Sequence, residues 1–427
     1  MEILSRLSGL IGIVVILGIC YFMSNNKTKI NLKTVFVGLF LQFMLAVFVL
    51  KVPIGKEIIT ILSKCINKLL VFSNVGADFV FGFLSSAGDL LDSTFFEGAS
   101  FLFAIKLIAT VIFILAIVNI LYYFGIMQKV VAFFAKLMYK VMDVSGIEAL
   151  SNVASAFVGQ VEAQIMVRPY LESATKSELL ASMTGSMACI AGGVMALYIA
   201  MGVPAEFLLA ASIMAAPGAL VVSKIVYPEV EDSKTKDNVK VEIKRTHVNL
   251  IDSIANAASV GMKVSLNVIA MLIALLSLIA MADYVLAKIG LFLYDFCHIH
   301  LSFIDLSNLS LKSLLGLFFS FFAFIVGTPP QDIANVGALM GEKFVLNEFI
   351  AYTDLIALKD VLSQKAIVIS SFALCGFANF GSIAIQIGGI GELAPSRRTD
   401  LARLGLRALI CGTLASYISA AMAGVLL

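Results

Sequence analysis

The sequence predicts an all-α integral membrane protein. Of its 427 residues, 60% are hydrophobic and 14% are charged, and the mean hydropathy is +1.01. A typical soluble domain carries about 25% charged residues, so we expect much of this chain to face lipid. Apolar runs of about 20 residues, enough for a helix to cross the hydrocarbon core, recur along its length. The alternating segments of about ten residues that a transmembrane barrel requires do not occur.

We predict about eight membrane-spanning helices. The first begins near Leu7; it resembles a signal peptide only superficially, because its apolar stretch is long and lacks a clear small-residue cleavage site. Two other segments, 53–93 and 248–290, mix charged with apolar residues, as interfacial or tilted amphipathic helices do. The predicted spans are residues 7–24, 33–51, 100–125, 178–202, 205–226, 310–327, 365–391 and 401–426.

Charge density marks one exposed connector, Glu229–Arg245, and helps to divide the chain. We expect N-terminal scaffold helices (1–52), an amphipathic segment (53–93), a scaffold helix (94–130), a first transport repeat (131–228), a soluble connector (229–247), an amphipathic segment with a scaffold helix (248–330) and a second transport repeat (331–427).

The two predicted repeats have similar patterns. Each contains a short Gly-containing segment with a glutamate, followed by a span interrupted by glycine or asparagine. Glu162 precedes Val194 by 32 positions, and Glu348 precedes Asn379 by 31. Such duplication, with broken helices, is typical of inverted-repeat transporters whose site lies at the repeat interface near the midplane. The alternative is that these glycines only allow close helix packing.

Two carboxylates, Glu162 and Glu348, lie in apolar surroundings. A charged side chain at bilayer depth costs about 2.5–3.5 kcal/mol even on lenient scales. Residues 146–170 and 331–352 are each too short to cross twice, so we predict two re-entrant hairpins, which are tolerated where they line a cavity. Their carboxylates and amides suit a solute with hydroxyls and a planar amide-like ring. The alternative is local ion pairing, of Glu162 with Arg168 and of Glu348 with Lys343.

Other function classes receive less support. The six cysteines lack metal-ligand spacing and are best interpreted as small hydrophobic residues; His298 and His300 form at most a weak metal pair. No Ser–His or His-rich arrangement occurs within a span, so we expect neither an enzyme nor a cofactor. A channel is disfavoured because the polar residues form one cluster and not rings. The net charge of +2, without a basic face, gives no reason to expect nucleic-acid binding.

Three segments resemble the signatures of the concentrative nucleoside transporters. They are GQVEA at 159–163, NEFIAY at 347–352 and CGFANFGSI at 375–383. The resemblance covers nearly the whole chain in order, and GGIG at 388–391 followed by Ala394-Pro395 also fits. The third segment is highly specific. The chain therefore resembles a bacterial member with the eight-span core.

The resemblance implies a symporter in the bacterial inner membrane that imports uridine-like nucleosides. It also implies a homotrimer, surrounded by lipid, in which each protomer moves a transport domain as an elevator against a scaffold. Gln160 and Glu162 would approach the nucleobase. The remaining implied nucleoside contacts are Val161 and Val194 beside the base, Phe377 lining the base side, and Glu348, Asn379 and Ser382 at the ribose hydroxyls.

The coupling ion is less clear from the resemblance. In sodium-driven relatives an asparagine four positions before the first hairpin glycine helps to hold the ion, and here that position is Ser155. The matching hydroxyl on the first broken helix is replaced by Cys189, leaving carbonyls of Val158 and Ile190. A buried carboxylate far from a fixed cation is expected to hold a proton near neutral pH. We therefore favour H⁺ over Na⁺, carried by Glu162 or Glu348. A competing hypothesis is a non-transporting gate-like membrane protein involved in assembly or signalling.

Overall fold

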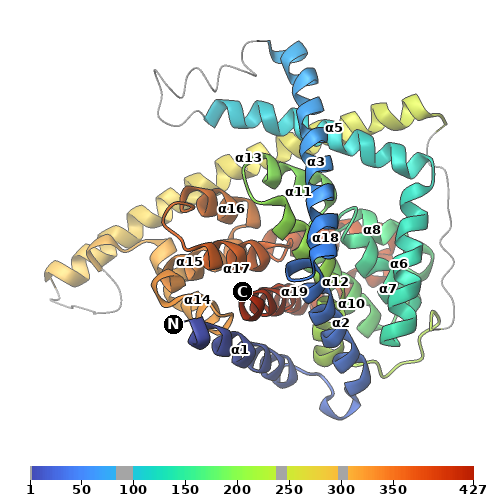
Figure 1. Cartoon of the computed structure of the whole chain (residues 1–427), viewed down its shortest axis with the longest axis horizontal. Coiled ribbons are helices and arrows are strands. Elements are labelled where there is room, and N and C mark those ends of the chain that lie inside the picture. The colour runs from blue at the N-terminus through green and yellow to red at the C-terminus, as the bar shows by residue number, and fades with distance from the viewer. Residues whose placement is uncertain (1, 83–99, 237–247, 297–305) are drawn as a thin grey trace.

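The computed structural model describes residues 2–82, 100–236, 248–296 and 306–427, and within these ranges the chain is helical with no strand (Figure 1). The α-helices are α1 (Glu2–Phe22), α2 (Leu32–Leu50), α3 (Pro53–Phe81), α5 (Ser100–Tyr123), α6 (Ile126–Met142), α7 (Gly146–Ser155), α8 (Glu162–Ile165), α9 (Arg168–Leu171), α10 (Lys176–Ala188), α11 (Gly192–Ala200), α12 (Ala205–Val226), α13 (Leu250–Leu291), α14 (Leu311–Ile325), α15 (Ile333–Val345), α16 (Glu348–Ala357), α17 (Gln364–Leu374), α18 (Phe380–Leu393) and α19 (Arg398–Leu426). Short 3-10 or π turns are η1 (Lys27–Lys29), η2 (Phe292–Phe296), η3 (Leu306–Asn308), η4 (Pro330–Asp332) and η5 (Pro395–Arg397).

The chain repeats one succession of elements, which confirms the inverted-repeat fold. The first copy runs through α5 and α6, a helix hairpin (α7 with α8 and α9), a broken helix (α10 and α11) and α12. The second runs through α13 and α14, a hairpin (α15 with α16), a broken helix (α17 and α18) and α19. Below, hairpin 1 and hairpin 2 denote these two hairpins, and break 1 (Cys189–Ala191) and break 2 (Cys375–Asn379) denote the two interruptions.

Helix α19 forms the centre of the molecule. It packs against α1, α10, α12, α17 and α18. Small residues allow this close approach, as is usual between membrane helices. A Cβ added at Gly412 would lie 2.8 Å from Met187 Cβ, and one at Gly424 would lie 2.6 Å from Val326 O. The helices that carry the hairpins and breaks are therefore assembled around one small-residue helix.

Two long helices, α5 and α13, cross at the edge of the molecule, and α13 then runs diagonally to α14 (Figure 1). The 42 residues of α13 make a rod about 63 Å long, about twice the hydrocarbon thickness, so it must tilt strongly if it spans a membrane. Seven helices within the described ranges are long and apolar enough to span a membrane. They include the helices at 53–81 and 250–295, where the sequence predicts amphipathic segments.

The structure corrects the prediction of a full span at 310–327. Helix α14 has 15 residues, about 22 Å, which is less than the hydrocarbon core. It packs along α15 and occupies the place in the second repeat that α6 has in the first. A short apolar run that covers a hairpin thus resembles a span in composition alone.

The helix starts and the two breaks follow local sequence. Ser145 and Thr175 form capping boxes at α7 and α10, and Asn347 and Asn379 cap α16 and α18. Side-chain oxygens at these positions satisfy backbone N–H groups that lack helical partners. Within break 2, Gly376 has a φ of +114°, a conformation that L side chains rarely adopt.

The described part of the predicted connector is held to the first repeat. Glu178, fully buried at the start of α10, accepts hydrogen bonds from Ser233 Oγ at 2.5 Å and Thr235 Oγ1 at 2.8 Å. Gly146 N donates to Thr235 O at 2.9 Å. Residues 237–247 of the connector, and the predicted weak metal pair His298 and His300, lie outside the described residues. No group of metal-ligating side chains occurs within the described ranges.

Candidate functional site

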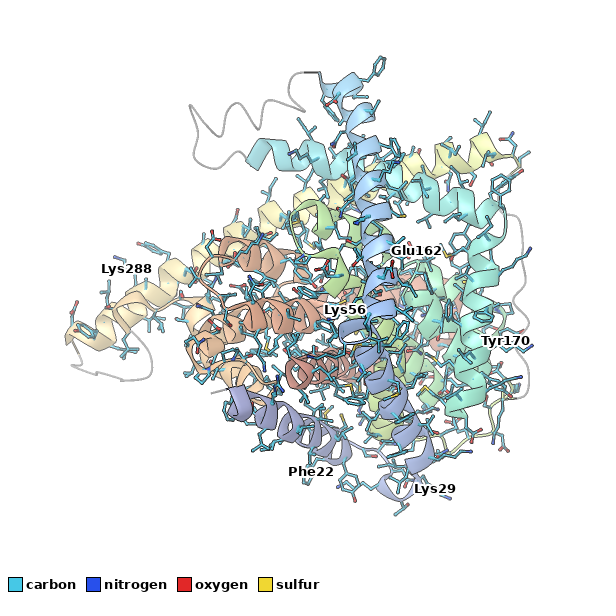
Figure 2. The ribbon with its side chains drawn as sticks, viewed as in Figure 1. Phe22, Lys29, Lys56, Glu162, Tyr170 and Lys288 are labelled. Atoms are coloured by element: carbon cyan, nitrogen blue, oxygen red, sulfur yellow. The ribbon has the colours of Figure 1, made fainter. Side chains whose placement is uncertain are left out.

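The tip of hairpin 1 presents Glu162 at the start of α8 (Figure 2). Gly159 has a φ of +136°, and a Cβ there would lie 2.6 Å from Glu162 Oε2, so glycine leaves room for the carboxylate. The Glu162 carboxylate also accepts from the backbone N–H groups of Val161 and of Glu162 itself. Glu162 is exposed. Glu162 forms no ion pair with Arg168 in the described structure, which disfavours the local-pair alternative.

The same tip contacts both broken helices. Gly192 N, at the start of α11, donates to Phe157 O at 3.2 Å. A Cβ at Gly389 on α18 would lie 2.6 Å from a Val161 methyl carbon. Gln160 Oε1 is buried without a hydrogen-bond partner, so one acceptor at the tip remains open. Val194 is half-buried on α11, two residues after Gly192.

Glu348 lies at the junction of hairpin 2 and both broken helices. Its carboxylate accepts from Tyr198 Oη on α11 at 2.9 Å and from Asn379 Nδ2 on α18 at 3.0 Å. Asn379 Oδ1 in turn accepts from Ser382 N at 2.9 Å. Glu348, Asn379 and Ser382 are all at most 6% exposed. The structure thus brings these three predicted residues together and adds Tyr198, which the sequence analysis missed.

Lys343 is a buried cation that interacts with Glu348. It is fully buried near the end of α15, and its Nζ donates to Ala373 O at 2.8 Å and to Cys375 O at 3.3 Å. It interacts electrostatically with Glu348 without forming an ion pair among the described residues. The sequence-based assumption that neither carboxylate has a fixed cation nearby is therefore wrong for Glu348, because α15 brings Lys343 into the same buried region.

The four candidate cation residues are buried around break 1. Ser155 Oγ donates to Ser151 O at 2.7 Å and lies 3.0 Å from Ser186 Oγ, which accepts from Gln164 Nε2 at 2.8 Å. These hydrogen bonds use hydroxyl protons, and the hydroxyl oxygens keep lone pairs. Cys189, Val158 and Ile190 are also buried, and a thiol is a poor ligand for a hard cation. Break 1 therefore offers few side-chain oxygens to a cation.

The predicted nucleoside contacts form two groups. Gln160, Val161 and Glu162 lie at hairpin 1, whereas Glu348, Asn379 and Ser382 lie at hairpin 2, and no described contact joins Glu162 to Glu348. Both groups rest on the same broken helices. Phe377, 9% exposed, belongs to the second group by its position in break 2, and its carbonyl accepts from Asn379 N at 2.9 Å. Tyr198 and Gln164 could have been suspected as polar groups within apolar helices.

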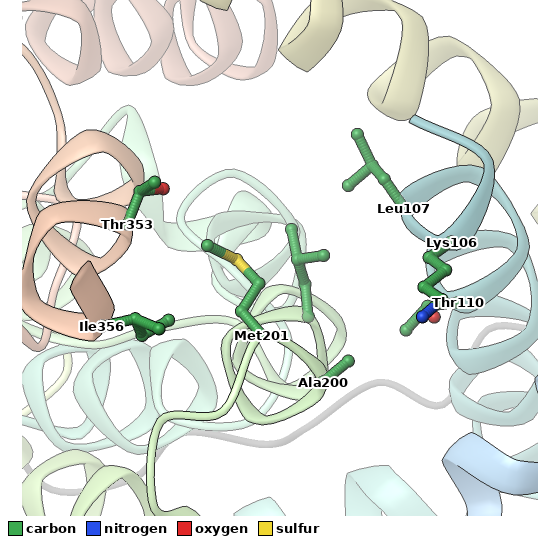
Figure 3. Close-up of a pocket in the computed structure, with 8 residues that line it drawn as sticks. Lys106, Leu107, Thr110, Ala200, Met201, Thr353 and Ile356 are labelled. Carbon is green, nitrogen blue, oxygen red and sulfur yellow. The ribbon is translucent and has the colours of Figure 1, made fainter. Parts of the chain in front are cut away.

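A separate cavity of about 280 Å³ lies between α5, α11 and α16 (Figure 3). No predicted site residue lines it. Thr353 and Ile356, on the helix that begins with Glu348, face Lys106 and Thr110 of α5 across it. The cavity therefore separates the element that carries Glu348 from one of the crossing helices. Its lining residues are Lys106, Leu107, Thr110, Leu197, Ala200, Met201, Thr353 and Ile356.

Family models match three parts of the chain. Those for the N-terminus and the C-terminus of the Na⁺ dependent nucleoside transporters match residues 11–84 and 207–424. A third, described as nucleoside recognition, matches residues 104–205. These matches follow one another in order and cover most of the chain.

Curated relatives match over the full length of the chain. It is 36% identical to the nucleoside permease NupC of Helicobacter pylori, over 99% of this chain and 98% of the permease. It is 39% identical to the uncharacterized transporter YutK of Bacillus subtilis, over 98% of both. It is 34% identical to sodium/nucleoside cotransporter 1 of Homo sapiens, over 97% of this chain and 63% of that protein.

Solved structures agree with these sequence matches. The chain superposes on CNTnw in an inward-facing substrate-bound state with a TM-score of 0.90 and 37% identity, over 100% of this chain and 98% of the other. A CNTnw variant in an outward-facing state gives a TM-score of 0.91 and 37% identity, over 99% and 97% of the two chains. These relatives do not favour the hypothesis of a non-transporting gate-like protein.

Proposed function

Because the chain belongs to the concentrative nucleoside transporter family, we propose that it imports uridine-like nucleosides by symport with a cation, H⁺ in preference to Na⁺. Membership makes it a transporter and not an enzyme. The observation that carries the proposal is Glu348, a buried carboxylate at the junction of hairpin 2 and both broken helices, which accepts from Tyr198 of α11 and from Asn379 at the N-cap of α18. Such a group is costly in an apolar protein unless it has a function.

The proposed substrate contacts divide by chemistry. Glu348, Asn379 and Ser382 would bind ribose hydroxyls, since a carboxylate accepts strongly from hydroxyl donors. Gln160 and Glu162 would approach the nucleobase, and the open Gln160 Oε1 supplies an acceptor for it. Val161 and Val194 would flank the base, and Phe377 would line its side. Hairpin 1 and hairpin 2 would then close on the nucleoside as re-entrant segments.

Proton coupling is supported by the two carboxylates and by break 1. At break 1, Ser155 stands where sodium-driven relatives carry an asparagine, and Cys189 stands where they carry a hydroxyl, so an amide oxygen and a hydroxyl oxygen are missing. Glu162 or Glu348 would carry the proton: Glu348 is buried, and Glu162, although exposed, has no cation among the described groups that interact with it. Na⁺ coupling remains the alternative, since the family model and the human relative are named for sodium.

We further propose an elevator movement within a homotrimer in a bacterial inner membrane, in contact with its lipids. A relative that shares this fold has been solved in inward-facing, intermediate and outward-facing states. Bacterial permeases of the same length are among the relatives. The hairpins and broken helices would move together past α5 and α13.

Uptake of radiolabelled uridine into proteoliposomes tests the proposal. An inward proton gradient alone should accelerate uptake severalfold over vesicles without a gradient, and an inward Na⁺ gradient alone should not. A protonophore should abolish the acceleration, while empty vesicles serve as the background. Uptake that follows Na⁺ and ignores the proton gradient would contradict proton coupling. No uridine uptake under either gradient would contradict the proposed substrate class.

A further inference from the structure

Lys343 is a buried cation for which the proposed nucleoside contacts give no role. Its side chain is fully buried, and two of the three donors of an ammonium group go to Ala373 O and Cys375 O. Both acceptors lie at the C-terminal end of α17, where break 2 begins. The neighbouring Glu342 pairs instead with Lys312 at 3.2 Å. A buried charge without a function is expensive, so this position needs an explanation.

The location suits a fixed positive charge. The last carbonyl groups of a helix lack helical donors and carry partial negative charge, which a cation stabilises. Ser416 Oγ donates to the same Cys375 O at 2.8 Å, so two side chains satisfy the carbonyl at this end of break 2. The corresponding end of α10 at break 1 has no such lysine among its described contacts; its polar neighbours are Ser155, Ser186 and Gln164.

The ammonium also acts on Glu348. Lys343 attracts the Glu348 carboxylate electrostatically, although the two do not form an ion pair in the described structure. The other titratable groups around Glu348 are the phenols of Tyr198 and Tyr352 and the thiol of Cys375, from α11, α16 and break 2. All three are neutral when protonated. Lys343 is therefore the group that can compensate a negative charge at Glu348.

We propose that Lys343 is a positioning residue of the nucleoside site, an internal cation that binds the carbonyl groups at the start of break 2 and so places the sugar-binding residues of that break. This inference rests on the proposed function. It goes further by assigning to the second repeat a tethered cation at the break that carries the sugar-binding residues. Removing the charge should weaken recognition of the sugar hydroxyl more than recognition of the base.

The test compares binding of uridine and 3′-deoxyuridine to the purified protein at pH 7. Lys343→Met keeps the chain length and removes the charge. It should weaken uridine binding about tenfold or more, the scale of a lost charge-assisted hydrogen bond, and 3′-deoxyuridine binding much less.

Ser416→Ala is the matched control, because it removes a neutral donor from the same Cys375 carbonyl. It should change the binding of both nucleosides equally. An equal loss of binding for both nucleosides in Lys343→Met would reduce Lys343 to a structural role and overturn the inference. If Lys343→Met does not fold, Lys343→Arg decides: retained sugar discrimination supports the inference, and lost discrimination in a folded variant contradicts it. Failure of the unmodified protein to bind uridine would instead contradict the proposed function.

Discussion

At the scale of single residues, Glu348 connects the two repeats. Its donors Tyr198 and Asn379 come from different broken helices, and Tyr198 lies 150 positions away along the chain. A carboxylate offers about four lone-pair sites. Two donors therefore leave acceptor capacity for a substrate hydroxyl. The Tyr198 ring also packs against Tyr352, with ring centroids 4.7 Å apart, which restricts where its hydroxyl can point.

Glu348→Gln should reduce the initial rate of uridine uptake at least tenfold. The amide removes the charge and can present its own donors to Tyr198 or Asn379, at a cost of about 1.5–3 kcal/mol. Uptake in proteoliposomes measures the effect, and size-exclusion chromatography checks that assembly is unchanged. Glu57→Gln, at an exposed position on α3, is the control and should transport normally. Normal uptake by Glu348→Gln would remove its ribose role.

At the scale of elements, the two broken helices meet at their breaks. Gly376 of break 2 lies against the C-terminal carbonyls of α10: a Cβ there would be 2.5 Å from Ala188 O and 2.7 Å from Met187 O. Hairpin 1 contacts the same broken helices, at the start of α11 through Phe157 O and Gly192 N and along α18 through Val161 and Gly389. The breaks thus form one contact region in which glycine is required both for space and for the positive φ of Gly376.

Gly376→Ala should lower both thermal stability and uridine uptake. The added methyl must displace a backbone carbonyl, and the left-handed conformation alone costs about 1–3 kcal/mol for such a residue. The midpoint of thermal unfolding in detergent with added lipid measures the first effect. Gly18→Ala, in α1 with nothing within 4 Å of the added Cβ, should leave stability equal or slightly higher. Equal midpoints of thermal unfolding for the two variants would show that the close contact at Gly376 does not contribute to stability.

At the scale of the whole molecule, the helix at the centre is much more deeply buried than the helix at the edge. In the most apolar stretch of α19, 83% of residues are buried, against 6% for α13. The cavity between α5, α11 and α16 lies where the edge meets the elements that carry Glu348. A movement of those elements past α5 must change its shape.

A thiol at Thr353 should report that movement. We expect the labelling rate of Thr353→Cys by a methanethiosulfonate reagent to change at least severalfold when uridine and a proton gradient are supplied together. The background should lack Cys65, which is exposed, and Cys297, which lies outside the described residues. Lys68→Cys, exposed on α3, should label at one rate throughout. An unchanged rate at Thr353→Cys would argue against the elevator.

Much of the fold could be predicted from the sequence because a helix that crosses lipid needs about 20 mostly apolar residues. Apolar length predicted most of the helices, and glycine and asparagine predicted where two of them break. Helix α14 was misjudged because 15 apolar residues that cover a hairpin look like part of a span. Segments 53–81 and 250–291 were judged by their charged residues, which a long tilted helix can place near its ends or toward polar partners.

The amino-acid sequence by itself determined that the chain is embedded in lipid, that it is duplicated, and that each copy brings one acidic side chain to an interrupted region. Only the tertiary structure decided that Tyr198 donates to Glu348, that Lys343 donates to carbonyl groups where break 2 begins, and that Ser155 is hydrogen-bonded. The reason is physical. Solvent and periodicity act on every residue locally, whereas the partner of a buried polar group depends on how distant helices rotate and pack.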